Sequence, residues 1–156
     1  MKALVAYYSR TGRTKKIAEA ISNNLNCDIE EIIDTTKRSG FFGIFRSKYQ
    51  AAKKMLTVLQ NSKNDPAFYD LVIIGTPVWS NTISTPIRTY IHQNKSRFKN
   101  VAFFCTFGGS GFEDMFCQME ELCGKKPVSA LAVDAMEVLK DNYMDKVKQF
   151  VDNILK

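Results

Sequence analysis

Short apolar runs that alternate with longer segments of helical periodicity constrain this chain more than any other feature. Two runs, LVII at 71–74 and VAFF at 101–104, are continuously apolar, which is typical of strands buried on both faces of a parallel sheet. The intervening segments carry apolar residues three and four positions apart, as amphipathic helices do. The pattern predicts strands at residues 2–8, 28–33, 69–75, 100–107 and 128–133, and helices at 14–25, 42–60, 84–94, 112–124 and 141–156.

This alternation of strands and helices predicts a doubly wound α/β fold with right-handed crossovers. The expected architecture has three layers, α/β/α, around a five-stranded parallel sheet of order 2-1-3-4-5. A length of 156 residues is ordinary for one domain, and the sequence contains no repeat, linker or low-complexity stretch. We therefore expect a single domain that spans residues 1–156.

Positive charge is concentrated in the first part of the chain. The net charge is +6 overall, +7 for residues 1–63 (12 Lys+Arg against 5 Asp+Glu) and −1 for residues 64–156 (10 against 11). No acidic residue lies between Asp34 and Asp65. Such a basic face indicates an anionic partner of some kind.

The segment 42–60 lies within this basic region and has the spacing of an amphipathic helix. We expect its apolar side to pack on the sheet and to leave only Lys and Arg facing solvent. An alternative is that the basic, Phe-rich stretch 37–54 contacts a membrane or nucleic acid. The expected apolar positions are Phe42, Phe45, Tyr49, Ala52, Leu56 and Leu59.

Several classes of protein are excluded by composition and motifs. No apolar run approaches the roughly 18 residues of a membrane span, and the N-terminal apolar run is too short for a signal peptide, so we expect a cytoplasmic protein. The four cysteines form no Cys-x-x-Cys pair, and His92 is the single histidine, which argues against a zinc site. A Walker loop and a dinucleotide Gly-x-Gly-x-x-Gly fingerprint are absent, and the order of His92 and Ser110 excludes a hydrolase triad.

Segments rich in Thr, Ser, Asn and Gly follow the first, third and fourth predicted strands. In an open parallel sheet, ligands bind at the carboxyl ends of the strands, and in this strand order the three segments are neighbours. We therefore expect them to form one pocket. Its candidate residues are Ser9, Arg10, Thr11, Gly12, Arg13, Thr14, Thr76, Pro77, Val78, Trp79, Ser80, Asn81, Thr82, Thr106, Phe107, Gly108, Gly109 and Gly111.

The first of these segments, residues 9–14, has the chemistry of a phosphate site. Its hydroxyls, its backbone N–H groups and the positive end of the following helix can surround an anion, and Gly12 allows close approach of the backbone. The alternative for Ser9 or Thr11 is a simple helix N-cap. The two further polar segments on adjacent strands favour the phosphate site.

The pattern Ser9-x-Thr11-Gly12-x-Thr14 after the first strand resembles the phosphate-binding motif of the flavodoxin family. The order of elements resembles that family, in its short-chain form, over the whole chain. The segments Thr-Pro-x-Trp at 76–79 and Cys-Thr-x-Gly-Gly-Ser-Gly at 105–111 resemble loops of small flavodoxin-like proteins. The resemblance implies noncovalent FMN, with its phosphate on residues 9–14 and its ring between 76–82 and 106–112.

Residue chemistry is consistent with a flavin slot in this place. Trp79 could stack on the ring and Phe107 could cover it; the alternative for Trp79 is a core or surface-packing aromatic. Pro77 fixes the entry to its segment, and Asn81 tolerates a positive φ. Glycines at 108, 109 and 111 leave N–H groups open to flavin oxygens, or form a plain turn.

The function implied by the resemblance is electron transfer by a soluble, monomeric flavodoxin that has no catalytic residue of its own and binds neither metal nor nucleic acid. The alternative is an FMN-dependent NAD(P)H or quinone oxidoreductase of the same superfamily. Two departures from the family bear on this choice. The chain is basic where flavodoxins are usually acidic, so its redox partner would need an acidic docking surface. In addition, segment 76–85 lacks the glycine of the flexible peptide that such carriers place beside the flavin.

Overall fold

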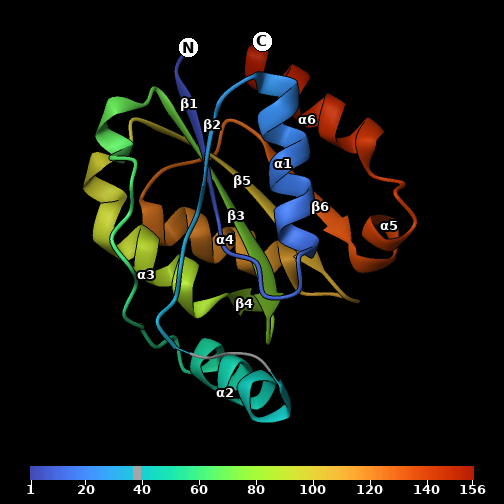
Figure 1. Ribbon diagram of the computed structural model, residues 1–156. Helices are drawn as coiled ribbons and strands as arrows, with labels where there is room; N and C mark the ends of the chain where they lie inside the picture. Colours follow the sequence, from blue (N-terminus) through green and yellow to red (C-terminus); the bar gives the residue numbers. More distant parts are fainter. Residues whose placement is uncertain (37–39) are drawn as a thin grey trace.

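The computed structural model describes residues 1–36 and 40–156 and contains a parallel sheet of order β2-β1-β3-β5-β6 (Figure 1). A short strand, β4, pairs antiparallel with the end of β3, off this path. The predicted order of five parallel strands is therefore confirmed. The strands are β1 (Ala3–Tyr7), β2 (Asp28–Glu31), β3 (Leu71–Trp79), β4 (Thr82–Ile83), β5 (Asn100–Phe107) and β6 (Ala130–Asp134).

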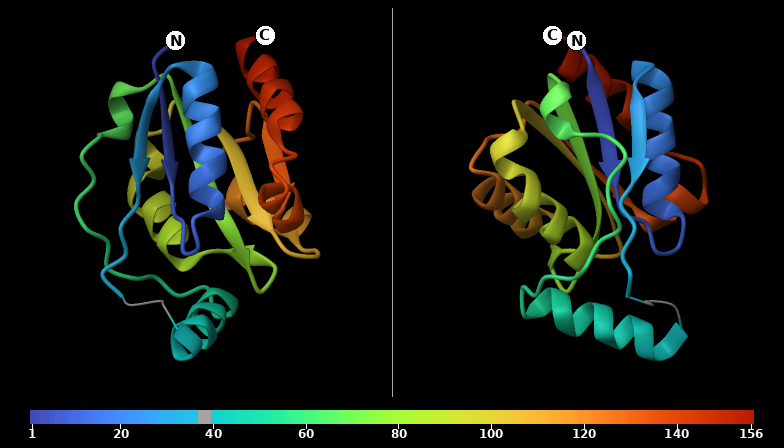
Figure 2. Two further views of the ribbon diagram at one scale, coloured as in Figure 1. Left: turned by 45° about the vertical axis from the view of Figure 1, so that its right-hand side comes forward. Right: turned by 60° about the vertical axis from the view of Figure 1, so that its left-hand side comes forward.

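Helices cover both faces of the sheet. One face carries α1 (Arg13–Leu25), α5 (Ala135–Leu139) and α6 (Met144–Leu155), and the other carries α3 (Thr85–Asn94) and α4 (Phe112–Cys123), as Figures 1 and 2 show. The 3-10 helices η1 (Pro66–Phe68) and η2 (Lys95–Arg97) precede β3 and β5. Helix α2 (Gly40–Ala52) belongs to neither layer and lies beyond the carboxyl end of the sheet.

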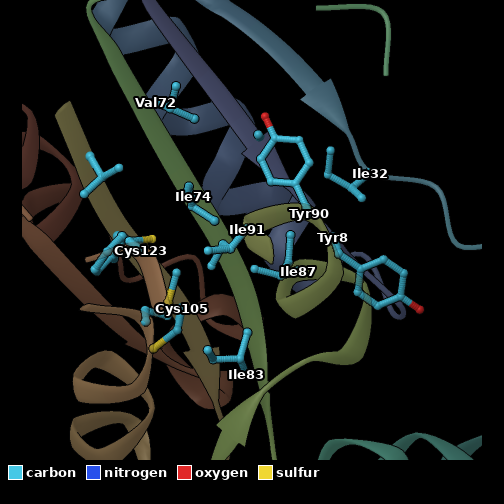
Figure 3. Close-up of a cluster of buried hydrophobic side chains, with 14 of the residues drawn as sticks. Tyr8, Ile32, Val72, Ile74, Ile83, Ile87, Tyr90, Ile91, Cys105 and Cys123 are labelled. Carbon is cyan, nitrogen blue, oxygen red and sulfur yellow. The ribbon is translucent and has the colours of Figure 1, made fainter. Parts of the chain in front are cut away.

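The core consists of two buried clusters, one on each side of the sheet, because successive strand residues point to opposite faces. In β1, Val5 packs with α1 and α6, whereas Leu4 and Ala6 pack toward α3 and α4. The cluster under α3 and α4 appears in Figure 3, where Ile74 of β3 lies beside Ile87 and Ile91 of α3. All of these side chains are fully buried. Both faces of the three central strands, β1, β3 and β5, are therefore buried along their apolar runs, as the sequence predicts.

Helix α2 differs from the sequence-based expectation in its length and its orientation. It ends at Ala52 rather than near residue 60, and the chain beyond Lys54 is extended. The expected apolar face was wrong, because Phe42, Phe45 and Tyr49 are exposed. The small residues Gly43, Ser47 and Ala51 form the buried face instead, and Ala52 and Leu56 are exposed while Leu59 is partly buried beyond the helix. Lys37 and Arg38 of the expected basic segment lie outside the described residues.

Strand β3 is longer than expected. It continues beyond Gly75 to Trp79 and returns through β4, with Val78 paired to Ile83 and Trp79 paired to Thr82. Residues 76–82, expected as a loop, therefore form a β-hairpin. Its two-residue turn, Ser80-Asn81, has positive φ at both positions (50° and 57°), which matches the type I′ turn of tight hairpins.

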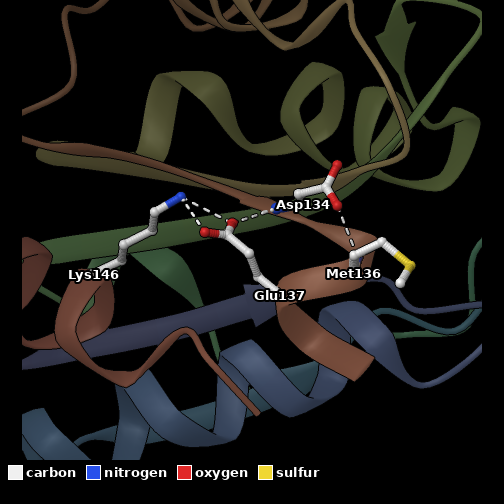
Figure 4. Close-up of polar contacts among 4 residues, drawn as sticks. All are labelled: Asp134, Met136, Glu137 and Lys146. Atoms are coloured by element: carbon white, nitrogen blue, oxygen red, sulfur yellow. Dashed lines mark hydrogen bonds and ion pairs between the residues drawn. The ribbon is translucent and has the colours of Figure 1, made fainter. Parts of the chain in front are cut away.

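A short helix that the sequence pattern did not predict, α5, follows β6 directly. Asp134 is its N-cap and accepts a hydrogen bond from Met136 N (2.8 Å), while Glu137 Oε2 accepts one from Asp134 N (2.9 Å), so the two residues form a capping box. Lys146 of α6 donates to the same carboxylate, as Figure 4 shows, and this bond lowers the pKa of Glu137. The Lys146–Glu137 ion pair ties α5 to α6.

Within residues 1–36 and 40–156, no helix combines the length and the apolar character needed to cross a membrane.

Gly75 allows β3 to pass directly under the ring of Phe104 on the neighbouring strand. A Cβ at Gly75 would lie 2.0 Å from Phe104 Cζ, so Gly75→Ala should lower the free energy of unfolding by about 1–3 kcal/mol through overpacking. Urea denaturation would measure the loss. Gly108→Ala is the control, because a Cβ there meets no atom within 4 Å and should change stability by less than about 0.5 kcal/mol.

The clash itself can be tested in a Phe104→Leu background, where the smaller side chain leaves room for the new methyl group. We expect the cost of Gly75→Ala to shrink by at least half in that background. An equal cost in both backgrounds would show that backbone effects at residue 75, and not the ring, set the preference for glycine.

Candidate functional site

The segment between β1 and α1 presents a helix N-terminus that is open to solvent. Gly12 is the N-cap residue of α1 and has φ 89°. Among the described residues, no side chain accepts a hydrogen bond from the first N–H groups of α1, and the first turn of the helix contains no Asp or Glu. Gly12 N instead donates to Ser9 Oγ (3.1 Å), which closes the loop on itself. Thr11, Gly12 and Arg13 are exposed. The uncapped end of α1, with Arg10 and Arg13 beside it, forms a positive site that suits an anion.

Thr14 connects the first loop to the end of β5. Its Oγ1 lies 2.8 Å from Thr106 Oγ1, and both residues are buried. The hydrogen bond holds two segments 92 residues apart in the chain at one edge of the sheet. It also means that the Thr14 hydroxyl, predicted to face a ligand, has a protein partner.

The hairpin of β3 and β4 closes the other side of this edge. Asn81, at its tip, packs against the loop after β5, since a Cβ at Gly111 would lie 2.3 Å from Asn81 Oδ1. Gly111 has φ 91° and is the N-cap of α4. Glycine is thus required there by both its backbone conformation and its close contact with the hairpin.

A buried arginine of α3 forms hydrogen bonds that hold the hairpin in place. Arg88 of α3 is only 7% exposed, and its Nη2 donates to Thr82 Oγ1 (2.8 Å) and to Gln118 Oε1 (3.2 Å). Gln118 of α4 in turn donates from Nε2 to Asn81 O (3.3 Å). Burial lowers the pKa of the Arg88 guanidinium, because it disfavours the charged form. The two acceptors, Thr82 and Gln118, are neutral and carry no negative charge that would compensate.

Thr76 and Ser84 fix the base of the hairpin. Thr76 Oγ1 accepts a hydrogen bond from Ser84 N (3.2 Å) and lies 2.9 Å from Ser84 Oγ, with both residues fully buried. The hydroxyls of Thr76 and Thr82, which were expected to face a ligand, therefore form hydrogen bonds within the protein. They stabilise the hairpin and are not exposed donors. Pro77 and Val78, between them, are half-buried.

Trp79 lies within the core at the hairpin and is 5% exposed. Tyr8 meets its ring edge-on at a centroid distance of 5.5 Å, and the Arg10 guanidinium lies over the ring at 5.6 Å. The first loop and the hairpin therefore touch through a cation–π contact. The exposed residues of the hairpin are Ser80 and Asn81, and Ser80 Oγ donates to Lys48 O of α2 (3.3 Å).

The loop after β5 completes the edge. Phe107 packs on Phe112 at the start of α4, with ring centroids 4.7 Å apart. Gly108 and Gly109 are exposed, and a Cβ at either would meet no atom within 4 Å. The three predicted segments thus lie at one edge, joined by Thr14–Thr106, Arg10–Trp79 and Asn81–Gly111 contacts.

Sequence reasoning missed the residues that support this edge. Arg88, Gln118 and Ser84 hold the hairpin, and Tyr8 packs on Trp79. The one available signal was Arg88 itself, a lone cation among the apolar positions of the segment PIRTYI. A hollow of about 460 Å³ adjoins the hairpin on its α4 side, lined by Ala52, Lys54, Ser80, Asn81, Thr82, Asp114, Cys117 and Gln118.

A family model described as flavodoxin matches residues 43–154, which is more than half of the chain. The chain belongs to the flavodoxin family. No curated protein matches the sequence of this flavodoxin-family chain. Its fold is the flavodoxin-like α/β fold, and the resemblance noted in the sequence is confirmed.

Solved structures agree with this assignment. A flavoprotein from Lactobacillus acidophilus NCFM, crystallised in complex with FMN, is 29% identical over 89% of this chain and 97% of that chain, with a TM-score of 0.74. Its apo-form, solved by NMR, is 30% identical over 89% and 95%, with a TM-score of 0.68. A protein from Bacteroides eggerthii DSM 20697 is 23% identical over 99% and 98%, with a TM-score of 0.77, and shows the shared fold.

The hairpin support is testable by removing Gln118. In Gln118→Ala the buried Arg88 guanidinium loses an acceptor, so the free energy of unfolding should fall by about 1–3 kcal/mol, and amide exchange at Asn81 and Thr82 should accelerate. Gln149→Ala, at an exposed position of α6, is the matched control. Equal costs for the two variants would contradict the support role.

Proposed function

We propose that this chain binds one FMN noncovalently at the edge formed by residues 9–14, 76–82 and 106–111, and that it acts as an electron carrier. The family membership and the likeness to an FMN-bound flavoprotein support the cofactor. The proposal covers the whole chain as one cytoplasmic, monomeric domain. When bound, FMN supplies the redox chemistry, and the protein supplies position and electrostatics.

The residues at this edge fit the two ends of FMN. The uncapped N-terminus of α1, with Thr11, Arg10 and Arg13 beside it, offers N–H groups, a hydroxyl and positive charge to the phosphate. Gly108 and Gly109 have no atoms within 4 Å of a Cβ position, which leaves their backbone open to the ring's carbonyl oxygens. Phe107 and the hairpin tip at Ser80 flank that opening.

Trp79 fits a different role from the expected stacking partner. Its ring is covered by Arg10 and Tyr8, and it is almost completely buried. We propose that it shapes the floor of the ring site through the hairpin, while half-buried Phe107 is the aromatic side chain placed to meet the flavin.

A single observation carries the choice of an electron carrier. The segments 9–14, 76–82 and 106–111 contain no Asp, Glu, His, Lys or Cys, and their charged residues are Arg10 and Arg13. A site without a titratable acid or base near neutral pH suits a protein in which the cofactor performs the reaction unaided. The surplus of positive charge suits a redox partner that docks through an acidic surface.

One feature of the hairpin favours a second candidate, an FMN-dependent NAD(P)H or quinone oxidoreductase. The turn at Ser80-Asn81 is held by Gln118 and by the carbonyl of Lys48, so this peptide is less free to reorient beside the ring than a glycine-containing loop. Hydride chemistry, which moves two electrons in one step, has no need of such reorientation.

The FMN site is tested by Thr11→Val, which removes one hydroxyl at nearly constant volume. A hydrogen bond to a charged group contributes about 1.5–3 kcal/mol, so the Kd for FMN should rise about tenfold or more. Titration of the apo-protein, followed by quenching of FMN fluorescence, measures this. Ser96→Ala removes an exposed hydroxyl at the opposite edge of the sheet and should leave the Kd unchanged. An unaltered Kd in Thr11→Val would refute the phosphate assignment.

Carrier and reductase are distinguished by mixing the FMN-loaded protein with NADH or NADPH under anaerobic conditions. We expect the flavin absorbance to persist with either nucleotide and to bleach with dithionite, because the site offers no group that orients a hydride donor. Bleaching by a nucleotide alone, at a rate that saturates with its concentration, would establish the reductase and reject the carrier.

A further inference from the structure

The outward side of helix α2 carries a continuous row of aromatic rings, here called the aromatic stripe. The stripe consists of Phe41, Phe42, Phe45 and Tyr49, which are 70%, 85%, 59% and 61% exposed. Phe41 packs edge-on against Phe42 and Phe45, with centroid distances of 5.9 and 4.8 Å. A contiguous apolar patch of this kind on the surface of a folded protein marks an interaction site.

The opposite side of α2 explains why the rings face outward. Gly43, Ser47 and Ala51, spaced four residues apart, are its buried positions, and Ser47 Oγ donates to Gly43 O (2.7 Å). Ala51 belongs to the same buried cluster as Trp79. If α2 were rotated about its axis by half a turn, its bulky aromatic rings would have to fit where only the small side chains of the buried face now pack. The outward orientation of the stripe is therefore built into the sequence of the helix.

Positive charges border the aromatic stripe. With about 100° of rotation per residue, Lys48 lies along one side of the stripe and Arg46 along the other, and Lys53 and Lys54 follow its end. All four are exposed, and the sequence has no acidic residue between Asp34 and Asp65. The apolar row and its cationic borders therefore lie on one solvent-facing surface.

The shape of this surface favours a lipid bilayer over a protein groove. Helix α2 stands beyond the sheet at one end of the molecule, apart from the two helical layers (Figure 2). Its exposed rings therefore project from the body of the protein and do not line a groove. Aromatic rings on one face with Lys and Arg beside them are typical of helices that lie in the headgroup region of anionic membranes. We propose that α2 docks this protein onto anionic lipid bilayers, with the aromatic stripe inserted among the headgroups.

The docking helix contacts the candidate site. Ser80 of the hairpin donates to the carbonyl of Lys48, so α2 and the carboxyl edge of the sheet face the same end of the molecule. The membrane proposal requires no flavin. Combined with the proposed function, it places the FMN next to the bilayer surface, where the redox partner would be a membrane-bound or lipid-dissolved electron donor or acceptor.

Vesicle cosedimentation tests the proposal, using the full-length protein with and without added FMN. We expect binding to phosphatidylcholine vesicles that contain phosphatidylglycerol, little binding to pure phosphatidylcholine, and weaker binding at high salt because the charges are screened. Binding should not depend on FMN. If vesicles are bound but FMN is not, the proposed function fails while the membrane proposal stands.

Matched variants assign the binding to the stripe. Phe42→Ser combined with Phe45→Ser should lower the vesicle partition coefficient by about tenfold or more, as should Arg46→Gln combined with Lys48→Gln. The controls are Phe68→Ser, at a 70% exposed phenylalanine of η1, and Lys126→Gln combined with Lys148→Gln, away from α2. Both should retain binding within about threefold. Thermal unfolding would verify that all variants remain folded.

Three results would overturn the proposal. The first is an absence of binding to anionic vesicles, and the second is an equal loss of binding in stripe and control variants. The third is concentration-dependent self-association, or tight binding of an acidic redox protein, that the stripe variants abolish while vesicles are not bound. In that case the stripe serves a second copy or a protein partner.

Discussion

The register of β3 between β1 and β5 determines where everything else in this protein lies. Gly75 is paired with Tyr7 on one side and with Phe104 on the other, so the three strands reach the same edge together. Backbone hydrogen bonds fix this alignment, and a slip of one residue would exchange the two buried faces. Because the alignment holds, the loop after β1, the hairpin at the end of β3 and the loop after β5 meet without long connections.

The strands and most helices could be predicted because their signal is the burial of apolar side chains. Runs such as LVII at 71–74 have one stable environment, between two helical layers. Helix α2 shows the limit of this reasoning. Periodicity reveals that Phe42, Phe45 and Tyr49 share a face, but it does not reveal what that face meets. The buried face of Gly43, Ser47 and Ala51 has no hydrophobic signature, since small residues pack closely without one.

The candidate site was predictable in its loops and not in its supports. Residues 9–14 follow a buried strand and precede a helix, and their chemistry is readable from the sequence. The hairpin is harder, because Pro77 suggests the end of a strand. In the structure Pro77 lies two residues beyond Gly75, the last residue that pairs with β1, and directly before Val78, where the pairing with β4 begins. Arg88 lies close in sequence to Thr82, but its other acceptor, Gln118, lies 30 residues further along the chain on α4, and that contact exists only after the two helices have packed.

Arg88 and α2 contact the hairpin from two sides and together restrain it. Burying a guanidinium with neutral partners costs free energy, and that cost is offset only if each nearby oxygen is held in place. Thr82 and Gln118 meet this requirement on the inner side, and the Ser80–Lys48 hydrogen bond restrains the outer side. The turn is therefore fixed between the core and α2. The turn thus lies between α2, which Ser80 contacts, and the loop at Gly111, which Asn81 contacts.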